Sequence, residues 1–107
     1  MIYELRIYEA VAGKMKELHD RFASHTLNLF KRHGMKSVGY WTDEIGTSNR
    51  LTYILAFESL ADREAKWAAF RKDPEWVQVL AETEKDGPLT ARVNATIMRP
   101  TSYSPMR

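Results

Sequence analysis

An acid, a base and a phenol alternate along the first segment of the chain, at Glu4, Arg6 and Tyr8. Side chains two residues apart share one face of a β-strand, so these three groups point to the same side. Arg92 belongs to the last segment with strand character, which we expect beside the first. An arginine in such a cluster can hold an anionic or enolate oxygen, to which Tyr8 can donate a hydrogen bond. The indole of Trp41 can stack on a flat ring, which makes the group a candidate ligand-binding site.

The same charges also allow a structural interpretation. Arg92 can reach Glu4 across neighbouring strands, and opposite charges in that position stabilise a sheet by about 0.2–1 kcal/mol. The sequence leaves both roles open. Replacing Arg6 with alanine would separate them, because a binding role predicts lost ligand affinity with an intact fold and a structural role predicts unfolding.

Three histidines, His19, His25 and His33, lie in one predicted helix. None has a histidine four residues away, and the helix offers at most two convergent ligands, too few for a metal site. We interpret His33 as a residue that finishes the helix. His25 is the better candidate for an acid or base at a cavity edge, because histidine titrates near neutral pH. Without a phosphate-binding glycine loop or a nucleophile elbow, we expect no metal and no cofactor.

The composition fits one small globular domain of 107 residues with a net charge of +2 and no cysteine. The lack of cysteine excludes disulfides, zinc–thiolate sites and thiol nucleophiles. It also suits a reducing compartment, so we expect a cytoplasmic protein. Lysine and arginine are dispersed along the chain, which argues against nucleic-acid binding. The first residues do not form a signal-peptide core, and no apolar run approaches the roughly 20 residues of a membrane span.

The spacing of apolar residues predicts four strands and two helical regions. We place the strands at 2–10, 35–44, 51–58 and 89–99, and the helices at 14–32, 60–71 and 74–84. Gly34 suits the left-handed position that ends a helix, and Asp73-Pro74 signals a new helix start within the second region. Residues 1–100 form the predicted domain and residues 101–107 a C-terminal tail.

The order β-α-β-β-α-β restricts the topology. Right-handed crossovers place the first and third strands at the centre of a four-stranded antiparallel sheet of order 4-1-3-2, an α+β fold. Both helices then cover one face, which we expect to include the first-strand residues Tyr3, Leu5 and Ile7. The bare face is expected to carry Ile2, Glu4, Arg6, Tyr8, Trp41, Ile54, Ala56, Arg92, Thr96 and Met98.

Such a bare face is too apolar for water and too charged for an ordinary core. A second copy packed sheet to sheet about a two-fold axis would satisfy both facts. We therefore expect a homodimer with a partly polar cavity between the two sheets.

The chain resembles the NIPSNAP family over nearly its whole length, to about Pro100. The resemblance rests on the order and spacing of Tyr3-Glu4-Leu5-Arg6, Tyr8, Arg32-His33-Gly34, Gly39-Tyr40-Trp41-Thr42, Glu44, Gly46, Asn49 and Asp73-Pro74-Glu75-Trp76. It implies the ferredoxin-like fold of the dimeric α+β barrel group, and a dimer. It implies little about chemistry, because many members have no assigned activity and the wider group includes cofactor-free monooxygenases, haem-dependent enzymes and stress-induced proteins.

Three functions are consistent with these observations. The first is a homodimeric barrel protein that binds a small aromatic or anionic molecule between the sheets, with Glu4, Arg6, Tyr8, Trp41, Arg92 and His25 as binding residues. The second is a cofactor-independent monooxygenase or isomerase of the antibiotic-biosynthesis-monooxygenase type, and the third is a structural or adaptor subunit. The sequence does not decide whether the protein is an enzyme, and it names no partner beyond the second copy.

Overall fold

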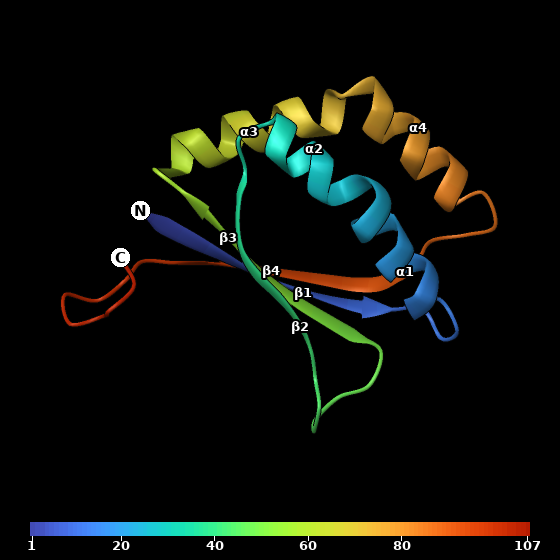
Figure 1. The fold of residues 1–107 in the computed structure, drawn as a ribbon, viewed down its shortest axis with the longest axis horizontal. Helices are drawn as coiled ribbons and strands as arrows, with labels where there is room; N and C mark the ends of the chain where they lie inside the picture. Colours follow the sequence, from blue (N-terminus) through green and yellow to red (C-terminus); the bar gives the residue numbers. More distant parts are fainter.

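Four strands and a layer of helices make up the fold, which a computed structural model describes for all residues, 1–107. The strands are β1 (Ile2–Ala10), β2 (Lys36–Thr42), β3 (Arg50–Phe57) and β4 (Thr90–Met98). The helices are α1 (Met15–Arg21), α2 (Leu27–Arg32), α3 (Leu60–Lys72) and α4 (Pro74–Thr83). The sheet is antiparallel in the order β2-β3-β1-β4, and all the helices lie on one of its faces (Figure 1). The predicted ferredoxin-like α+β topology is confirmed.

Local sequence signals set the ends of the helices. Gly34, with φ at +69°, takes the left-handed conformation that stops α2. The carboxylate of Asp73 accepts a hydrogen bond from the backbone N–H of Glu75 at 2.9 Å and caps α4, with Pro74 in the first turn. The second helical region is therefore broken into α3 and α4 at the predicted place.

The first helical region contains a wide turn that the sequence analysis did not include. Residues Phe22–Thr26, between α1 and α2, form a π-helical turn in which the N–H of Leu27 donates to the carbonyl of Phe22. In an ordinary α-helix, side chains four residues apart point in slightly different directions, because one turn contains 3.6 residues. The wider turn cancels this difference. As a result Leu18, Phe22, Thr26 and Phe30, each four residues apart, are all buried toward the sheet.

The two faces of β1 are the reverse of the prediction. Glu4 pairs in register with Leu55, and Arg6 pairs with Tyr53, both of which are fully buried beneath the helices. Partners in an antiparallel register project to the same side, so the helices cover Glu4, Arg6 and Tyr8. The bare face instead carries the apolar residues Tyr3, Leu5 and Ile7.

This reversal removes the charged groups from the bare face. The predicted cavity between two sheets, lined by Glu4, Arg6 and Tyr8, is therefore wrong for these residues. The helix layer also stops short of β4, because Val93 and Ile97 project to the helix side yet are 42% and 39% exposed. The space above β1 and β4 is thus open along one edge of the sheet.

Candidate functional site

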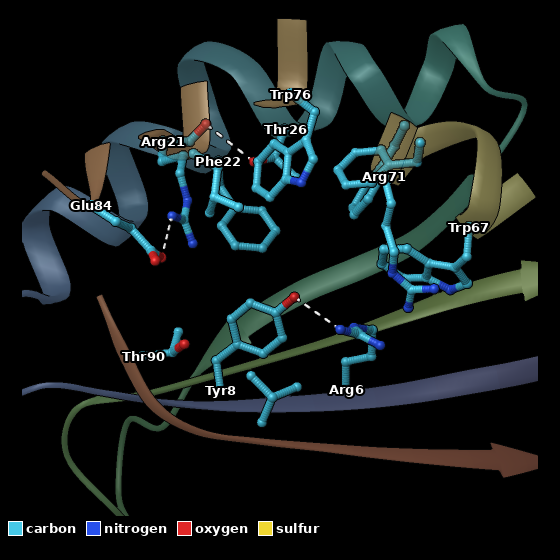
Figure 2. Close-up of a pocket in the computed structure, with 14 residues that line it drawn as sticks. Arg6, Tyr8, Arg21, Phe22, Thr26, Trp67, Arg71, Trp76, Glu84 and Thr90 are labelled. Carbon is cyan, nitrogen blue, oxygen red and sulfur yellow. Dashed lines mark hydrogen bonds and ion pairs between the residues drawn. The ribbon is translucent and has the colours of Figure 1, made fainter. Parts of the chain in front are cut away.

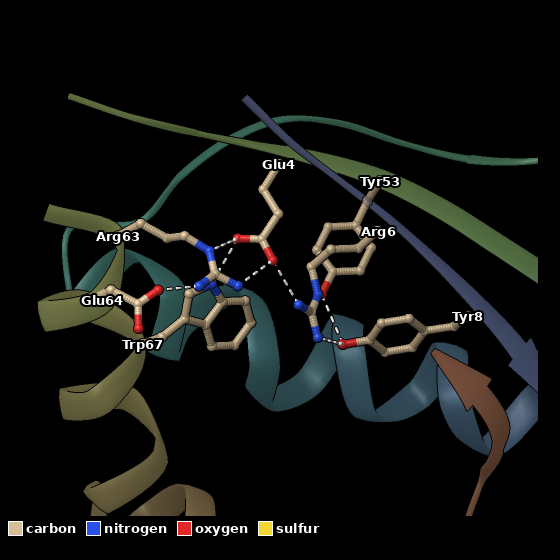
Figure 3. A network of polar contacts seen from close by, with 7 residues as sticks. All are labelled: Glu4, Arg6, Tyr8, Tyr53, Arg63, Glu64 and Trp67. Carbon is tan, nitrogen blue, oxygen red and sulfur yellow. Dashed lines mark hydrogen bonds and ion pairs between the residues drawn. The ribbon is translucent and has the colours of Figure 1, made fainter. Parts of the chain in front are cut away.

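A buried carboxylate organises the polar groups between β1 and α3. Glu4 is fully buried and accepts hydrogen bonds from Arg63 through Nε at 2.8 Å and Nη2 at 3.0 Å. The indole N–H of Trp67 donates to the same carboxylate at 2.9 Å, and Arg6 Nη1 donates at 2.7 Å. Figure 3 shows Arg63 and Trp67 approaching Glu4 from α3 and Arg6 approaching it from β1, with Glu64 on the far side of Arg63. The carboxylate is held by four hydrogen bonds, three of them from guanidinium groups.

This arrangement explains why an acid can lie in the core. Burial alone would raise the pKa of Glu4, but the hydrogen bonds from Arg63, Trp67 and Arg6 outweigh it and hold the pKa below its ordinary value. Two cations therefore surround one anion. The predicted cross-strand partner of Glu4, Arg92, is not involved.

Beside Glu4, Arg6 connects two phenols. Its Nε donates to the hydroxyl of Tyr53 at 2.7 Å and its Nη2 donates to the hydroxyl of Tyr8 at 3.2 Å. The two hydroxyls lie 2.8 Å apart. Figure 3 shows the guanidinium of Arg6 extending from Glu4 to this pair. Burial raises the pKa of Tyr53 well above its ordinary value, so Tyr53 keeps its proton near neutral pH.

The proton directions in the pair follow from counting donors. A phenol has one proton to donate. The hydroxyl of Tyr53 has two hydrogen-bonding neighbours, Arg6 Nε, which is a donor, and the hydroxyl oxygen of Tyr8. Tyr53 must therefore donate to Tyr8, because its proton would otherwise be buried without a partner. Tyr8 then accepts from both Tyr53 and Arg6, and its own proton is free to be donated elsewhere.

The hydroxyl of Tyr8 borders a cavity of about 200 Å³ between the helices and the sheet. Figure 2 shows side chains from α3, α4 and the first helical region on one side of it, and β1 on the other. Six of the fourteen lining residues are aromatic, and the charged ones are three arginines and one glutamate. The lining residues are Arg6, Tyr8, Arg21, Phe22, Thr26, Phe30, Trp67, Phe70, Arg71, Trp76, Leu80, Glu84, Thr90 and Val93.

The structure brings together three of the six predicted site residues, Glu4, Arg6 and Tyr8. Trp41 lies on the bare face and is 50% exposed, and it pairs in register with Thr52. Arg92 also belongs to the bare face, where its register partner on β1 is Glu9 rather than Glu4, so the predicted contact with Glu4 is wrong.

His25, the sixth predicted residue, lies outside this cavity. It borders a separate groove that also includes Gln78 and Val79 of α4. The reason is its position in the π-helical turn, where Phe22 and Thr26 take the side that faces the sheet. A role for His25 at the edge of the aromatic cavity is therefore not supported by its place.

Several residues of the site, among them Arg63, Trp67 and Phe70, were not identified from the sequence. Arg63 lies four residues before Trp67, so the two share one side of α3. That spacing is a signal that could have identified the partner of Glu4. No comparable signal identifies Arg21, Arg71 or Glu84, which lie in the last turns of α1 and α3 and directly after α4.

No group of three or more histidine, cysteine, aspartate or glutamate side chains is placed to hold a metal ion. Likewise, no helix has the length and apolar character needed to cross a membrane.

The sequence matches the NIPSNAP family model over residues 3–105, which is nearly the whole chain. The chain belongs to the NIPSNAP family. A NIPSNAP family protein of unknown function from Agrobacterium tumefaciens is 31% identical, with 100% of this chain and 94% of that chain covered and a TM-score of 0.87. A second NIPSNAP family protein from Agrobacterium tumefaciens is 24% identical, with 99% and 98% covered and a TM-score of 0.88.

The NIPSNAP domain also shares its fold with more distant proteins. A candidate antibiotic biosynthesis monooxygenase from Nitrosomonas europaea has a TM-score of 0.65 at 12% identity, with 96% of this chain and 100% of that chain covered. At that identity the likeness concerns the fold alone. No curated protein matches the chain closely enough to count as a relative.

Proposed function

We propose that this NIPSNAP domain binds a small aromatic molecule carrying a hydrogen-bond-accepting oxygen, in the cavity between its helices and its sheet. The observation that carries the proposal is the hydroxyl of Tyr8, which accepts a hydrogen bond from Arg6 and lies 2.8 Å from the hydroxyl of Tyr53, at a cavity with six aromatic lining residues. By the donor count given above, the proton of this hydroxyl has no acceptor within the protein, and a ligand oxygen would supply one. The binding place differs from the one predicted between two sheets, but the chemical class of the ligand is the same.

The size of the cavity limits the ligand. A dry protein cavity of about 150 Å³ holds benzene, so about 200 Å³ gives room for a single substituted ring. Rings prefer edge-to-face or offset-stacked packing, and Tyr8 and Phe22 already meet edge to face at 5.7 Å. Arg6, Arg21 and Arg71 outnumber Glu84, which favours an anion over a cation. An open cavity also speaks against a purely structural or adaptor role.

Titration with 4-nitrophenol tests this proposal, because the probe has one ring and an acidic oxygen. Tyr8→Phe removes the hydroxyl and keeps the ring, and we expect it to weaken phenolate binding about tenfold, or about 1.4 kcal/mol. Tyr40→Phe is the matched control, because the hydroxyl of Tyr40 lies 2.6 Å from Ser37 Oγ and does not border the cavity. The control should bind as the unmodified protein does. No binding by the unmodified protein, or equal binding by the Tyr8→Phe variant, would refute the proposal.

We further propose that the chain forms a homodimer through the bare face of the sheet. The reversal of β1 makes this face more apolar than predicted, since Tyr3, Leu5 and Ile7 join Ile54 on it and remain only partly buried. The covering partner is a second copy, because an apolar sheet face shared by identical chains is self-complementary about a two-fold axis.

Sedimentation velocity at micromolar concentration tests the dimer. Ile54→Asp places a charge next to Leu5, its register partner, and should give monomers. Ile45→Asp makes the same change at a loop position that is 96% exposed, and it should leave the assembly unchanged. A monomeric unmodified protein would contradict the proposal.

A second candidate function is a cofactor-independent monooxygenase or isomerase. It is favoured by the donor at Tyr8, which two hydrogen bonds, one from Arg6, polarise toward an oxygen on which negative charge develops. Such an enzyme should consume dissolved oxygen with an oxidisable polyphenol such as pyrogallol, or exchange the α-protons of an enolisable ketone. Tyr8→Phe should slow either reaction at least tenfold relative to Tyr40→Phe. Rates equal to those of buffer alone would exclude this function.

A further inference from the structure

Arg21, at the end of α1, is a buried arginine whose donors are only partly used. Its side chain is 5% exposed, and Nη1 donates to Glu84 Oε2 at 3.0 Å and to Thr83 Oγ1 at 3.2 Å. Its Nε is buried and has no partner among the atoms of the protein. Figure 2 shows the guanidinium extending from the helix toward the cavity, with Glu84 at one side. Arg21 therefore faces the cavity with one occupied edge and one free edge.

The free edge has the shape that carboxylates bind. Arginine carries five N–H donors in a planar fork, and two parallel N–H···O bonds to a carboxylate are its strongest interaction. The atoms Nε and Nη2 form one such fork, and no carboxylate of the protein lies against it. An unpartnered Nε in a buried position destabilises the folded protein, and a bound carboxylate would remove that cost.

Arg6 and Arg63, the other largely buried arginines of the site, differ in this respect. The Nε of Arg50 is also buried without a partner, but Arg50 lies outside the cavity. Arg6 uses Nε, Nη1 and Nη2 for Tyr53, Glu4 and Tyr8. Arg63 uses its three nitrogens for Glu4 and Glu64, outside the cavity. Among the buried cations at the site, Arg21 alone keeps an unfilled fork.

We propose that Arg21 is the carboxylate-binding residue of the cavity and that the ligand is a single-ring aromatic carboxylate. The inference rests on the proposed function and adds the ligand's second polar group. The carboxylate would lie on the Nε–Nη2 edge, with the ring among the aromatic side chains, where Phe22 follows Arg21 in the chain and Trp76 lies 5.4 Å from its guanidinium. Glu84 keeps the guanidinium in place through Nη1, and it also opposes the bound anion through its own charge.

Calorimetric titration with benzoate and benzamide tests the assignment, because the two probes have nearly the same shape and differ in charge. The unmodified protein should bind benzoate at least tenfold more tightly than benzamide. Arg21→Gln should bring the two affinities within twofold of each other. Arg32→Gln removes an arginine that pairs with Asp73 and Glu75 outside the cavity, so it is the matched control and should keep the preference. Thermal unfolding of each variant confirms that it is folded.

Glu84→Gln separates a binding role from a structural one. Glutamine keeps an oxygen for Arg21 Nη1 but removes the opposing charge, so benzoate should bind more tightly, by about threefold or more. A purely structural role of the Arg21–Glu84 pair predicts the opposite, because breaking the pair from either side would weaken the binding of both probes. Equal affinities for benzoate and benzamide, or weaker benzoate binding by the Glu84→Gln variant, would overturn the assignment while 4-nitrophenol binding still supported the cavity. If benzoate, benzamide and 4-nitrophenol all fail to bind the unmodified protein, the proposed function fails as well.

Discussion

Replacing Glu4 with glutamine is the sharpest test of the buried network. The substitution keeps the size of the side chain, but it turns one carboxylate oxygen into an NH₂ group. Placed at Oε2, that group would meet Arg6 Nη1 at 2.7 Å and Arg63 Nη2 at 3.0 Å, both of which are donors. The two guanidiniums, only 11% and 17% exposed, would also lose their shared counter-charge.

The expected loss of stability follows from this geometry. Removing one partner of a buried ion pair costs about 3–5 kcal/mol. The lower value applies here, because Arg63 keeps its exposed partner Glu64 and can turn toward solvent. About 3 kcal/mol corresponds to a fall in Tm of about 12 °C for a domain of this size. Calorimetry or circular dichroism at pH 7 measures this shift.

Glu64→Gln provides the control, because Glu64 is the second acidic partner of the same arginine. Its side chain is 68% exposed, and exposed pairs contribute at most about 1 kcal/mol. We expect Tm to change by less than about 4 °C. If Glu4→Gln lowers Tm no more than Glu64→Gln does, the network does not stabilise the fold and the reasoning is refuted.

Acid titration gives an independent signature of the same carboxylate. The pKa of Glu4 in the folded protein lies below its ordinary value of 4.5. A lowered pKa contributes stability that is complete above the unfolded value and is lost as the pH falls through the folded value. The difference in stability between the unmodified protein and Glu4→Gln should thus be constant above about pH 5 and shrink below pH 4.5. A difference that stayed constant into strong acid would show that Glu4 is not the titrating group.

Three further substitutions test the fold around the site. Leu55→Ala empties a fully buried position and should cost about 3 kcal/mol in urea unfolding, and a cost below 1 kcal/mol would contradict the packing. Ser59→Ala removes the oxygen that accepts from the N–H of Asp62 at 3.1 Å and should cost about 1 kcal/mol, whereas Ser59→Asp should restore the cap. Gly39→Ala would place a methyl group 2.7 Å from the indole of Trp41, so the half-exposed ring must turn away, and tryptophan emission should shift while Tm changes little. An unchanged spectrum would argue against that contact.

The topology was predictable from the sequence because several independent signals agree. Gly34 and Asp73-Pro74 mark helix ends, and β3 is so apolar that Leu55 could only face the core. The order of the elements then leaves few ways to assemble the sheet. These signals are local, so they can be recognised without knowledge of the tertiary contacts.

The orientation of β1 was not predictable in the same way. Alternation shows which residues share a face, but it does not show which face meets the helices. Both faces of β1 are partly apolar, and the charged face was the less favourable of the two for burial in the core. Glu4 is buried because Arg63 and Trp67, from a helix more than 50 residues away in sequence, supply its donors. Such a contact is visible only once α3 is placed over β1.

The π-helical turn escaped prediction for a related reason. The prediction of an apolar stripe assumes a fixed rotation per residue. A single wide turn changes the direction in which every later side chain faces. Phe30 and Thr26 are buried through that shift, and Arg21 enters the cavity just before it. The cavity therefore depends on a departure from regular helix geometry that no single residue in the sequence predicts.

The reversal of β1 also changes how ligand binding and assembly relate to each other. With the charged face inward, Arg6 and Tyr8 line a cavity made by one chain, while Leu5 and Ile7 project to the opposite side of the same strand. The proposed dimer would then use a surface that shares no side chain with the proposed ligand site. A charge introduced at Ile54 should disrupt assembly without touching the cavity, so the resulting monomer should still bind 4-nitrophenol. Had the charged face pointed outward, every loss of the dimer would have opened the ligand site to water, and the two properties could not be separated.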